Sequence, residues 1–300
     1  MIQALETVHL SKHYSRKWAL RNCTLQIPIG SIAGLVGPNG AGKTTLLHLI
    51  TGLLAPSNGA ITILGHTPGK DMKQLLPRIG FVSQEHPLYK TFTVKEMLMV
   101  GQKLNRTWNQ EQALQRLERL GIPLHQQTGK LSGGQQAHVA LILALAKQPE
   151  FLILDEPVAS LDPIARREFQ QTLLDAVAEH GMTVLISSHN VADLERFCDY
   201  LIILSTSRVQ FATRVDSLMQ SHKMLVGPRE RMESIARTHT IVAASGTGKQ
   251  CTLLVQTHGP FLDLAWQVHS VSLEDIILAY LSQSKSALAG QDGRTLEVAQ

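Results

Sequence analysis

The sequence is poor in cysteine, in aromatic residues and in long apolar runs. Its three cysteines, Cys23, Cys198 and Cys251, lie far apart and form no CxxC pair, which argues against a disulfide framework or a zinc site and favours a reduced, cytosolic compartment. No stretch approaches the roughly 20 apolar residues that a membrane-spanning helix needs. Residues 1–17 also lack the apolar run of a signal peptide. We therefore expect any action at a membrane to depend on another chain.

The sequence also lacks blocks of like charge. Lys and Arg together number 28 against 24 Asp and Glu, a net charge of +4, and the basic residues are scattered along the chain. This distribution indicates a solvated surface rather than a nucleic-acid-binding patch. With 300 residues, of which 44% are hydrophobic, the chain is long enough for one full domain and a smaller one.

Short apolar strands alternate with helical patterns along most of the chain, which predicts an α/β fold with a mostly parallel core sheet. The opening strands predict an N-terminal antiparallel β subdomain. Apolar residues at three-to-four-residue spacing after Pro87 predict an inserted helical subdomain. The expected division is a first domain over 1–220 with its insertion at about 87–146, a small C-terminal α/β domain over 221–285, and a loose tail over 286–300.

Residues 37–45 read "GPNGAGKTT" and lie between an apolar strand and an apolar helix. This is the context that the phosphate-binding pattern GxxxxGK[ST] requires. Backbone N–H groups of such a loop surround a phosphate, Lys43 neutralises the β- and γ-phosphates, and the Thr44 hydroxyl can bind Mg²⁺. The residues expected at the nucleotide are Gly37, Pro38, Asn39, Gly40, Ala41, Gly42, Lys43, Thr44 and Thr45. A similar string, "SGTGKQ" at 245–250, has no apolar helix after it and predicts a hairpin turn.

Two acids end the apolar segment "FLILDEP" at 151–157, at the sheet edge where α/β proteins bind ligands. Asp155 is suited to hold Mg²⁺, and Glu156 to act as a general base toward water. Gln84 and His189 also follow strands, so Gln84 can reach the metal or the water and His189 the γ-phosphate. Acids after a strand can be accidental, and a lone histidine is more often structural. Their combination with a phosphate loop favours the functional interpretation.

A second site suited to phosphate lies at residues 131–135, "LSGGQ", which open another helix. The first N–H groups of a helix have no partners within it and attract anions. One domain with one nucleotide does not obviously need two such sites.

The motifs "GPNGAGKTT", "SQ", "LSGGQ", "LILDEP", "LDP" and "SSH" occur in this order over residues 3–220, and together they resemble the ATP-binding subunits of ABC transporters. The resemblance implies head-to-tail pairing with a second ATP-binding subunit, a homodimer being expected. Each ATP then lies between the phosphate loop of one copy and the "LSGGQ" segment of the other. It also implies a transmembrane permease as partner, docked near 84–88 and the helical insertion, and a peripheral location at the cytoplasmic face of the membrane.

By the same resemblance, Ser132, Gly133, Gly134 and Gln135 contact the ATP held by the partner copy. Tyr14 stacks on adenine, although it could simply be a tyrosine at a strand edge, and Asp162 crosses the dimer interface. The segment 271–281, "VSLEDIILAYL", resembles the ending of exporter ATPases and favours efflux. The alternatives are an ABC importer ATPase or a soluble ABC ATPase that acts on nucleic acid or ribosomes; we expect no nucleic-acid partner.

Residues 131–135, "LSGGQ", are called the signature below. Just after them the sequence departs from the family pattern. Ala137 and His138 stand where a Gln-Arg pair is usual, and Ile142 replaces an arginine. These changes lead us to expect a weaker interface or slower turnover. Lys43, Asp155, Glu156 and His189 are intact, so the resemblance implies an active ATPase that uses ATP with Mg²⁺.

Overall fold

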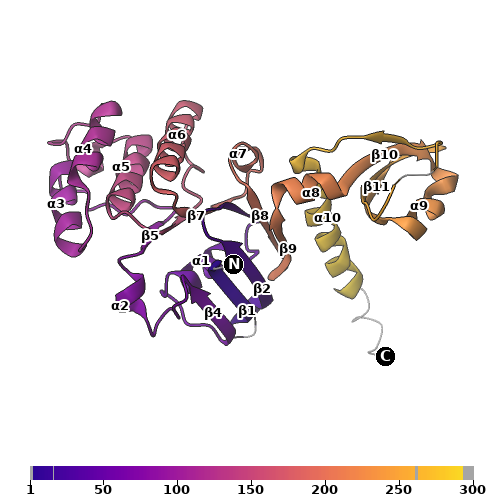
Figure 1. Ribbon diagram of the computed structural model, residues 1–300, viewed down its shortest axis with the longest axis horizontal. Helices are drawn as coiled ribbons and strands as arrows, with labels where there is room; N and C mark the ends of the chain where they lie inside the picture. Colours follow the sequence, from indigo (N-terminus) through magenta and orange to yellow (C-terminus); the bar gives the residue numbers. More distant parts are fainter. Residues whose placement is uncertain (1–2, 16, 261–262, 293–300) are drawn as a thin grey trace.

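The computed structural model describes residues 3–15, 17–260 and 263–292. Its centre is a six-stranded sheet in the order β5-β6-β7-β3-β8-β9, which is parallel except for the last strand (Figure 1). The strands are β3 (Ile32–Val36), β5 (Ile79–Val82), β6 (Phe151–Asp155), β7 (Thr183–Ser188), β8 (Tyr200–Ser205) and β9 (Arg208–Arg214). Strands β6, β7 and β8 are buried along their whole length, as apolar runs in a covered parallel sheet should be. The predicted α/β fold with a mostly parallel core sheet is confirmed.

A second, antiparallel sheet is built from the start of the chain, in the order β2-β1-β4. Its strands are β1 (Gln3–Tyr14), β2 (Lys17–Pro28) and β4 (Asn58–Ile63). Helix α1 (Lys43–Ile50) shares one hydrophobic core with this sheet and with the central sheet, through Leu46, Leu47, Leu49 and Ile50. The N-terminal sheet thus holds the helix that follows the phosphate loop.

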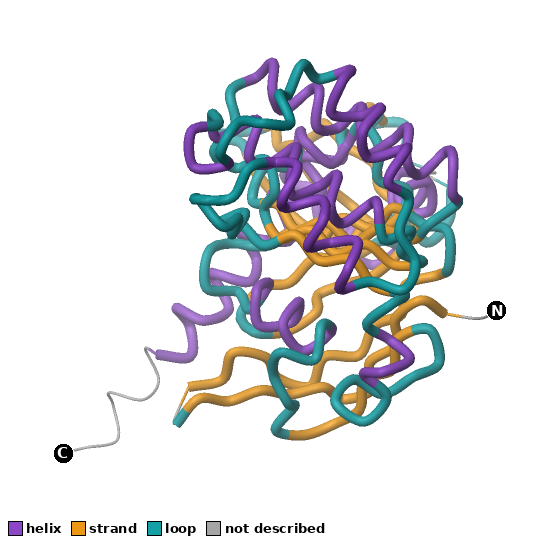
Figure 2. The backbone as a smooth tube through the Cα atoms, turned by 90° about the vertical axis from the view of Figure 1, so that its left-hand side faces the viewer, coloured by secondary structure: helices purple, strands orange, loops and turns teal. Residues whose placement is uncertain are grey.

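The inserted region is helical, as its apolar spacing predicted. It contains α3 (Val94–Leu104), α4 (Gln110–Arg119), the 3-10 turn η1 (Thr128–Lys130) and α5 (Gly133–Ala146), after the short α2 (Met72–Leu75). These three long helices share a core of their own and gather at one end of the molecule, away from the N-terminal sheet (Figure 2). Helix α5 also packs against α6 (Pro163–His180). Helix α5 is therefore held between the inserted helices and α6.

Strands β8 and β9 form a hairpin. Its turn residues Thr206 and Ser207 both have positive φ, +50° and +63°, as a type I′ turn requires at its two central positions. Ser207 also donates a hydrogen bond to the carbonyl of Trp18 (3.0 Å), which ties the turn to β2. The helices α7 (Ala192–Glu195) and α8 (Val215–Ser221) flank this pair of strands.

The C-terminal region is a four-stranded antiparallel sheet in the order β11-β12-β10-β13. It consists of β10 (His222–Pro228), η2 (Arg229–Arg231), α9 (Met232–Thr238), β11 (Thr240–Ser245), β12 (Gln250–Gln256) and β13 (Gln267–His269), followed by α10 (Leu273–Asp292). Strands β11 and β12 pair around residues 245–250, so the predicted hairpin turn is confirmed. The hydroxyl of Ser272 accepts a hydrogen bond from the Asp275 N–H (3.1 Å) and caps α10.

Two features of this region differ from expectation. Helix α10 continues to Asp292, past residue 285 where we expected a tail to begin; residues 293–300 lie outside the described part. The C-terminal sheet also shares a hydrophobic core with the first 220 residues, because Val242, Leu254 and Ile276 belong to the same cluster as Leu201 and Ile203. In the described residues no helix has the length and apolarity needed to span a membrane.

Candidate active site

The loop between β3 and α1 is shaped by its glycines. Gly40 and Gly42 have φ of +80° and +108°, which side chains disfavour. A Cβ on Gly42 would lie 2.3 Å from the Ala19 carbonyl oxygen, and one on Gly37 2.1 Å from that of Leu204. The loop can thus fold closely between β2 and β8, and helix α1 begins at Lys43 with its first N–H groups free for an anion.

The side chain of Lys43 is almost fully buried, with 5% exposed, and lies at the centre of the site. Its ammonium group donates a hydrogen bond to the Gly37 carbonyl (2.9 Å) and lies 3.2 Å from a carboxylate oxygen of Glu156. Lys43 thus connects the phosphate loop to the acids at the end of β6.

Asp155, the last residue of β6, is 2% exposed and accepts a hydrogen bond from the Ser187 hydroxyl of β7 (2.7 Å). The same hydroxyl accepts from the Glu156 N–H (2.8 Å). Ser187 therefore fixes both acids relative to the sheet. Its role was not apparent from the sequence, where it is simply the first residue of "SSH".

Glu156 has φ of +44°, which turns its side chain out of the strand direction and back toward the phosphate loop. The His189 ring donates from Nδ1 to its second carboxylate oxygen (3.0 Å). Burial raises the pKa of Glu156, but the hydrogen bonds and charges of Lys43 and His189 together hold that pKa below its usual value. Glu156 is thus kept ionised, the form that a general base requires.

A cleft of about 470 Å³ opens over these groups. It brings together most of the residues predicted at the nucleotide: Tyr14, Asn39, Gly40, Gly42, Lys43, Thr44, Thr45, Gln84 and Glu156. Gly37 and Ala41 are buried beneath the loop, and Asp155 lies behind Glu156. His189 lines a small neighbouring hollow that shares Glu156 with the cleft. Sequence reasoning missed Lys17, Trp18 and Ala19, which line the cleft across the hairpin from Tyr14.

The signature residues are not in this cleft. The Ser132 hydroxyl accepts from the Gln135 N–H (3.2 Å) and the Gln135 side chain accepts from the Ser132 N–H (3.1 Å), a capping box that starts α5. Asp162 caps α6 in a similar way, by accepting from Ile164 and Ala165. Within one chain, neither motif lines the cleft over the phosphate loop.

The donors at this site suit a magnesium–nucleotide complex. Mg²⁺ prefers oxygen ligands, and Thr44, Gln84 and Asp155 offer a hydroxyl, an amide oxygen and a carboxylate. The glycine loop, Lys43 and the N-terminus of α1 offer N–H groups and positive charge to phosphates. A parallel α/β sheet with this loop between strand and helix, and with acids at the end of a neighbouring strand, defines a P-loop nucleoside triphosphatase.

The comparisons with known proteins identify the family. A family model described as "ABC transporter" matches residues 20–159. The "Nod factor export ATP-binding protein I" of Rhizobium johnstonii is 36% identical over 210 residues, which are 68% of this chain and 67% of the relative. The "Phosphonates import ATP-binding protein PhnC" of Thiobacillus denitrificans is 35% identical over 64% of this chain and 80% of the relative.

Solved structures agree. One is described as the structure of the ATP-binding subunit of an ABC transporter. It has a TM-score of 0.65 and 28% identity, and the match covers 72% of this chain and 92% of the chain in that structure. Another is a dimeric ATP-binding cassette in a post-hydrolysis state with ADP and Pi. It has a TM-score of 0.62 and 27% identity, and the match covers 70% of this chain and 98% of the chain in that structure. The chain belongs to the ATP-binding subunits of ABC transporters. It is an ATPase that uses ATP with Mg²⁺, and proteins of its class act as dimers with a transmembrane permease.

Proposed function

We propose that two copies of this chain pair head to tail and that each ATP is bound between the phosphate loop of one copy and residues 132–135 of the other. The observation that carries this proposal is the separation of the two phosphate-binding helix starts within one chain. A Cβ on Gly133 would meet nothing within 4 Å, whereas one on Gly134 would lie 2.9 Å from Ala165. The start of α5 is therefore open on the Gly133 side and packed on α6 on the other. An exposed, capped helix start of this kind suits a phosphate supplied from outside the chain.

Within each such site the residues have separate roles. Lys43 and the N–H groups of residues 37–45 hold the β- and γ-phosphates. Thr44, Gln84 and Asp155 are the residues that would hold Mg²⁺, which when bound neutralises phosphate charge. The Tyr14 ring is 48% exposed, and the Lys12 ammonium group lies 5.4 Å from its centroid, so the ring can accept adenine. Asp162, at the start of α6, is placed at the interface between the copies.

Hydrolysis follows from the contacts of Glu156. Its carboxylate takes a proton from water as the water oxygen bonds to the γ-phosphorus and the bond to the oxygen of the β-phosphate breaks. Lys43 neutralises the charge left on ADP, and His189 orients Glu156 and reaches the γ-phosphate. Loss of the γ-phosphate removes contacts that join the two copies, so the pair opens.

The permease is proposed to dock in an apolar groove of about 500 Å³ beside the helical region. The groove is lined by Phe81, Met97 and Trp108 and by two exposed side chains. These are Tyr89, which is 65% exposed, and Leu53, which is 63% exposed. Ser83 and His86, on either side of Gln84 in the chain, line the groove, so a permease helix seated there would sense the nucleotide site. Exposed apolar side chains gathered in one groove are typical of a protein interface.

We further propose that the complex exports its substrate, that the ATPase pair is a homodimer and that it lies at the cytoplasmic face of the membrane. Support for efflux comes from the "VSLEDIILAYL" ending, in which Val271, Leu273, Ile276 and Ile277 are buried against the first domain. The relatives include the Nod factor export protein described above. They also include the "Bacitracin transport ATP-binding protein BcrA" of Bacillus licheniformis, which is 30% identical. Import remains the alternative, because phosphonate import and zinc uptake proteins are equally similar.

Glu156→Gln tests the shared site. This variant should bind ATP but hydrolyse it at least about 100-fold more slowly, since a general base contributes about 10²–10⁴. Gel filtration with ATP should show a stable dimer, and adding Ser132→Arg should return the protein to a monomer. The matched control, exposed Glu118→Gln, should behave like wild type. A Glu156→Gln protein that stays monomeric with ATP would rule out the proposed sandwich.

A further inference from the structure

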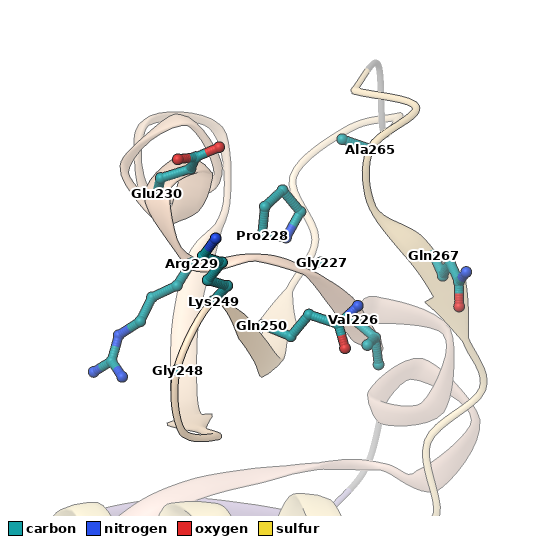
Figure 3. Close-up of a pocket in the computed structure, with 10 residues that line it drawn as sticks. All are labelled: Val226, Gly227, Pro228, Arg229, Glu230, Gly248, Lys249, Gln250, Ala265 and Gln267. Atoms are coloured by element: carbon teal, nitrogen blue, oxygen red, sulfur yellow. The ribbon is translucent and has the colours of Figure 1, made fainter.

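We propose that a cleft at the outer end of the C-terminal sheet binds a small oxyanionic ligand, one that carries a carboxylate or phosphate group. The cleft has a volume of about 750 Å³, within the range of small-molecule sites. It is larger than the nucleotide cleft and shares no residue with it. Its lining comes from the end of β10, from η2, from the turn before β12 and from the segment around β13 (Figure 3).

Two cationic residues, Arg229 and Lys249, line this cleft and start side by side; in Figure 3 their charged ends diverge, with the Arg229 guanidinium extended away from Pro228. The Arg229 N–H donates to the Lys249 carbonyl (2.9 Å), which holds the two residues side by side. Among the described residues neither side chain forms an ion pair. The only carboxylate in the lining is Glu230, so the lining carries a net positive charge.

The acid two residues before Ala265 of the lining, Asp263, is already engaged. Asp263 accepts a hydrogen bond from the Arg231 guanidinium (3.1 Å) and another from the Ala265 N–H (3.0 Å). Arg229 and Lys249 are therefore left to attract an external anion. An arginine fork beside a lysine is well matched to the oxygens of a carboxylate or phosphate.

Neutral hydrogen-bonding groups complete the site on the opposite side. Val226 pairs with Gln267 of β13, and Pro228 pairs with Gln250 of β12, so all four side chains project from one face of the sheet. In Figure 3, Arg229 and Lys249 lie on one side and Gln267 on the other, with Pro228 and Val226 between them. The ligand should thus have an anionic group at the cations and an organic body over Val226 and Pro228, within reach of the amides.

Trp266 supports the lining from the other face of the sheet, within the core formed with Leu225 and Leu253. A Cβ on Gly227 would lie 2.6 Å from the Trp266 ring, so glycine at this position lets the indole pack close against β10. Trp266 is 4% exposed, and its chain neighbours Ala265 and Gln267 both line the cleft. Its fluorescence should therefore report an occupant.

The test uses the full chain saturated with the magnesium complex of a non-hydrolysable ATP analogue, which fills both the β- and the γ-phosphate positions, so that added anions cannot occupy the phosphate loop. Glutarate and inorganic phosphate are titrated separately, at an ionic strength held constant with NaCl. Binding is measured by calorimetry on the wild-type chain and by Trp266 fluorescence in a Trp18→Phe, Trp108→Phe background. We expect a saturable response to at least one anion. Saturation by glutarate alone assigns a carboxylate ligand, and saturation by phosphate alone assigns a phosphate.

The Arg229→Gln, Lys249→Gln double variant should weaken that binding at least about tenfold, because two charge-assisted contacts are lost. Arg237→Gln removes an exposed cation of α9 outside the lining and should leave the affinity unchanged. Unchanged thermal unfolding and ATPase activity would show that the double variant is folded. No saturable response to either anion, or an equal loss of affinity in Arg237→Gln, would overturn the proposal.

Discussion

At the scale of single residues, the most informative feature is the position of Glu156 between Lys43 and His189. Its two carboxylate oxygens contact one cationic side chain and one imidazole, at 3.2 and 3.0 Å. The phosphates of ATP compete with Glu156 for Lys43, so nucleotide binding should release one oxygen for water. His189 keeps its hold on the other oxygen. His189 thus orients Glu156, and the loss of the contact with Lys43 leaves one carboxylate oxygen free for water.

This arrangement predicts how activity depends on pH. Because the pKa of Glu156 is below its ordinary value in the free enzyme, the acid limb of kcat/KM should lie below the ordinary range of a glutamate. His189→Gln removes one of the contacts that stabilise the carboxylate, so the pKa of Glu156 should rise and the limb should move to higher pH. The measurement is the pH profile of ATP hydrolysis at low ATP concentration. His125→Gln, at an exposed histidine, should keep the wild-type profile; an unmoved limb in His189→Gln would contradict the inferred contact.

At the scale of elements, the signature helix α5 has buried groups where the family pattern has glutamine and arginines. Ala137 is fully buried and Ile142 is 1% exposed, each within a hydrophobic cluster. His138 is 3% exposed, and among the described residues neither ring nitrogen has a partner in good hydrogen-bond geometry; its weak polar neighbours are the Ala165 backbone and a Glu168 oxygen 3.9 Å from Nε2. The helix is therefore anchored by apolar packing, with one poorly satisfied histidine facing α6.

His138→Leu should accordingly stabilise the protein by about 1–2 kcal/mol, since it removes unsatisfied buried polar groups. Burial lowers the pKa of His138, against the opposing charge of Glu168. The unfolded chain therefore binds a proton at higher pH than the native one, and wild-type stability should fall as the pH drops through about 6.5. The variant should lose part of this pH dependence. Urea unfolding at pH 5.5 and 7.5 measures both effects, and His125→Leu is the control. Equal destabilisation of His138→Leu at both pH values would refute the prediction.

Local sequence was sufficient to predict the elements that carry the chemistry. Residues 37–45 form a turn because of their glycines, and residues 151–157 begin as a strand because of a contiguous apolar run. Both elements could therefore be located from the sequence alone. Ser187 could not be assigned a role, because its bonds to Asp155 and Glu156 depend on the pairing of β6 with β7. The C-terminal cleft was likewise hidden, since Arg229, Lys249 and Gln267 come to line one cleft only when β10 pairs with both β12 and β13. The length of α10 was underestimated because polar residues after 282 resemble a tail.

At the scale of the whole molecule, the separation of the two phosphate-binding helix starts gives a test that only a shared site can pass. Lys43→Ala disables the phosphate loop of its own copy, and Ser132→Arg disables the signature offered to the partner. Each variant alone should be inactive, since both sites of either homodimer contain one defect. In a mixed dimer, however, the loop of the Ser132→Arg copy meets the intact signature of the Lys43→Ala copy.

An equal mixture of the two inactive variants should therefore recover ATPase activity. Half of the dimers are mixed and each has one intact site, so the recovery should approach about a quarter of the wild-type rate if the sites act independently in a symmetric pair. Phosphate release against mixing ratio should peak at equal amounts. A Lys43→Ala, Ser132→Arg double variant mixed with Lys43→Ala should stay inactive, because no intact loop is present. If the two single variants do not complement each other although they dimerise, each copy must complete its own site, and the second helix start has another purpose.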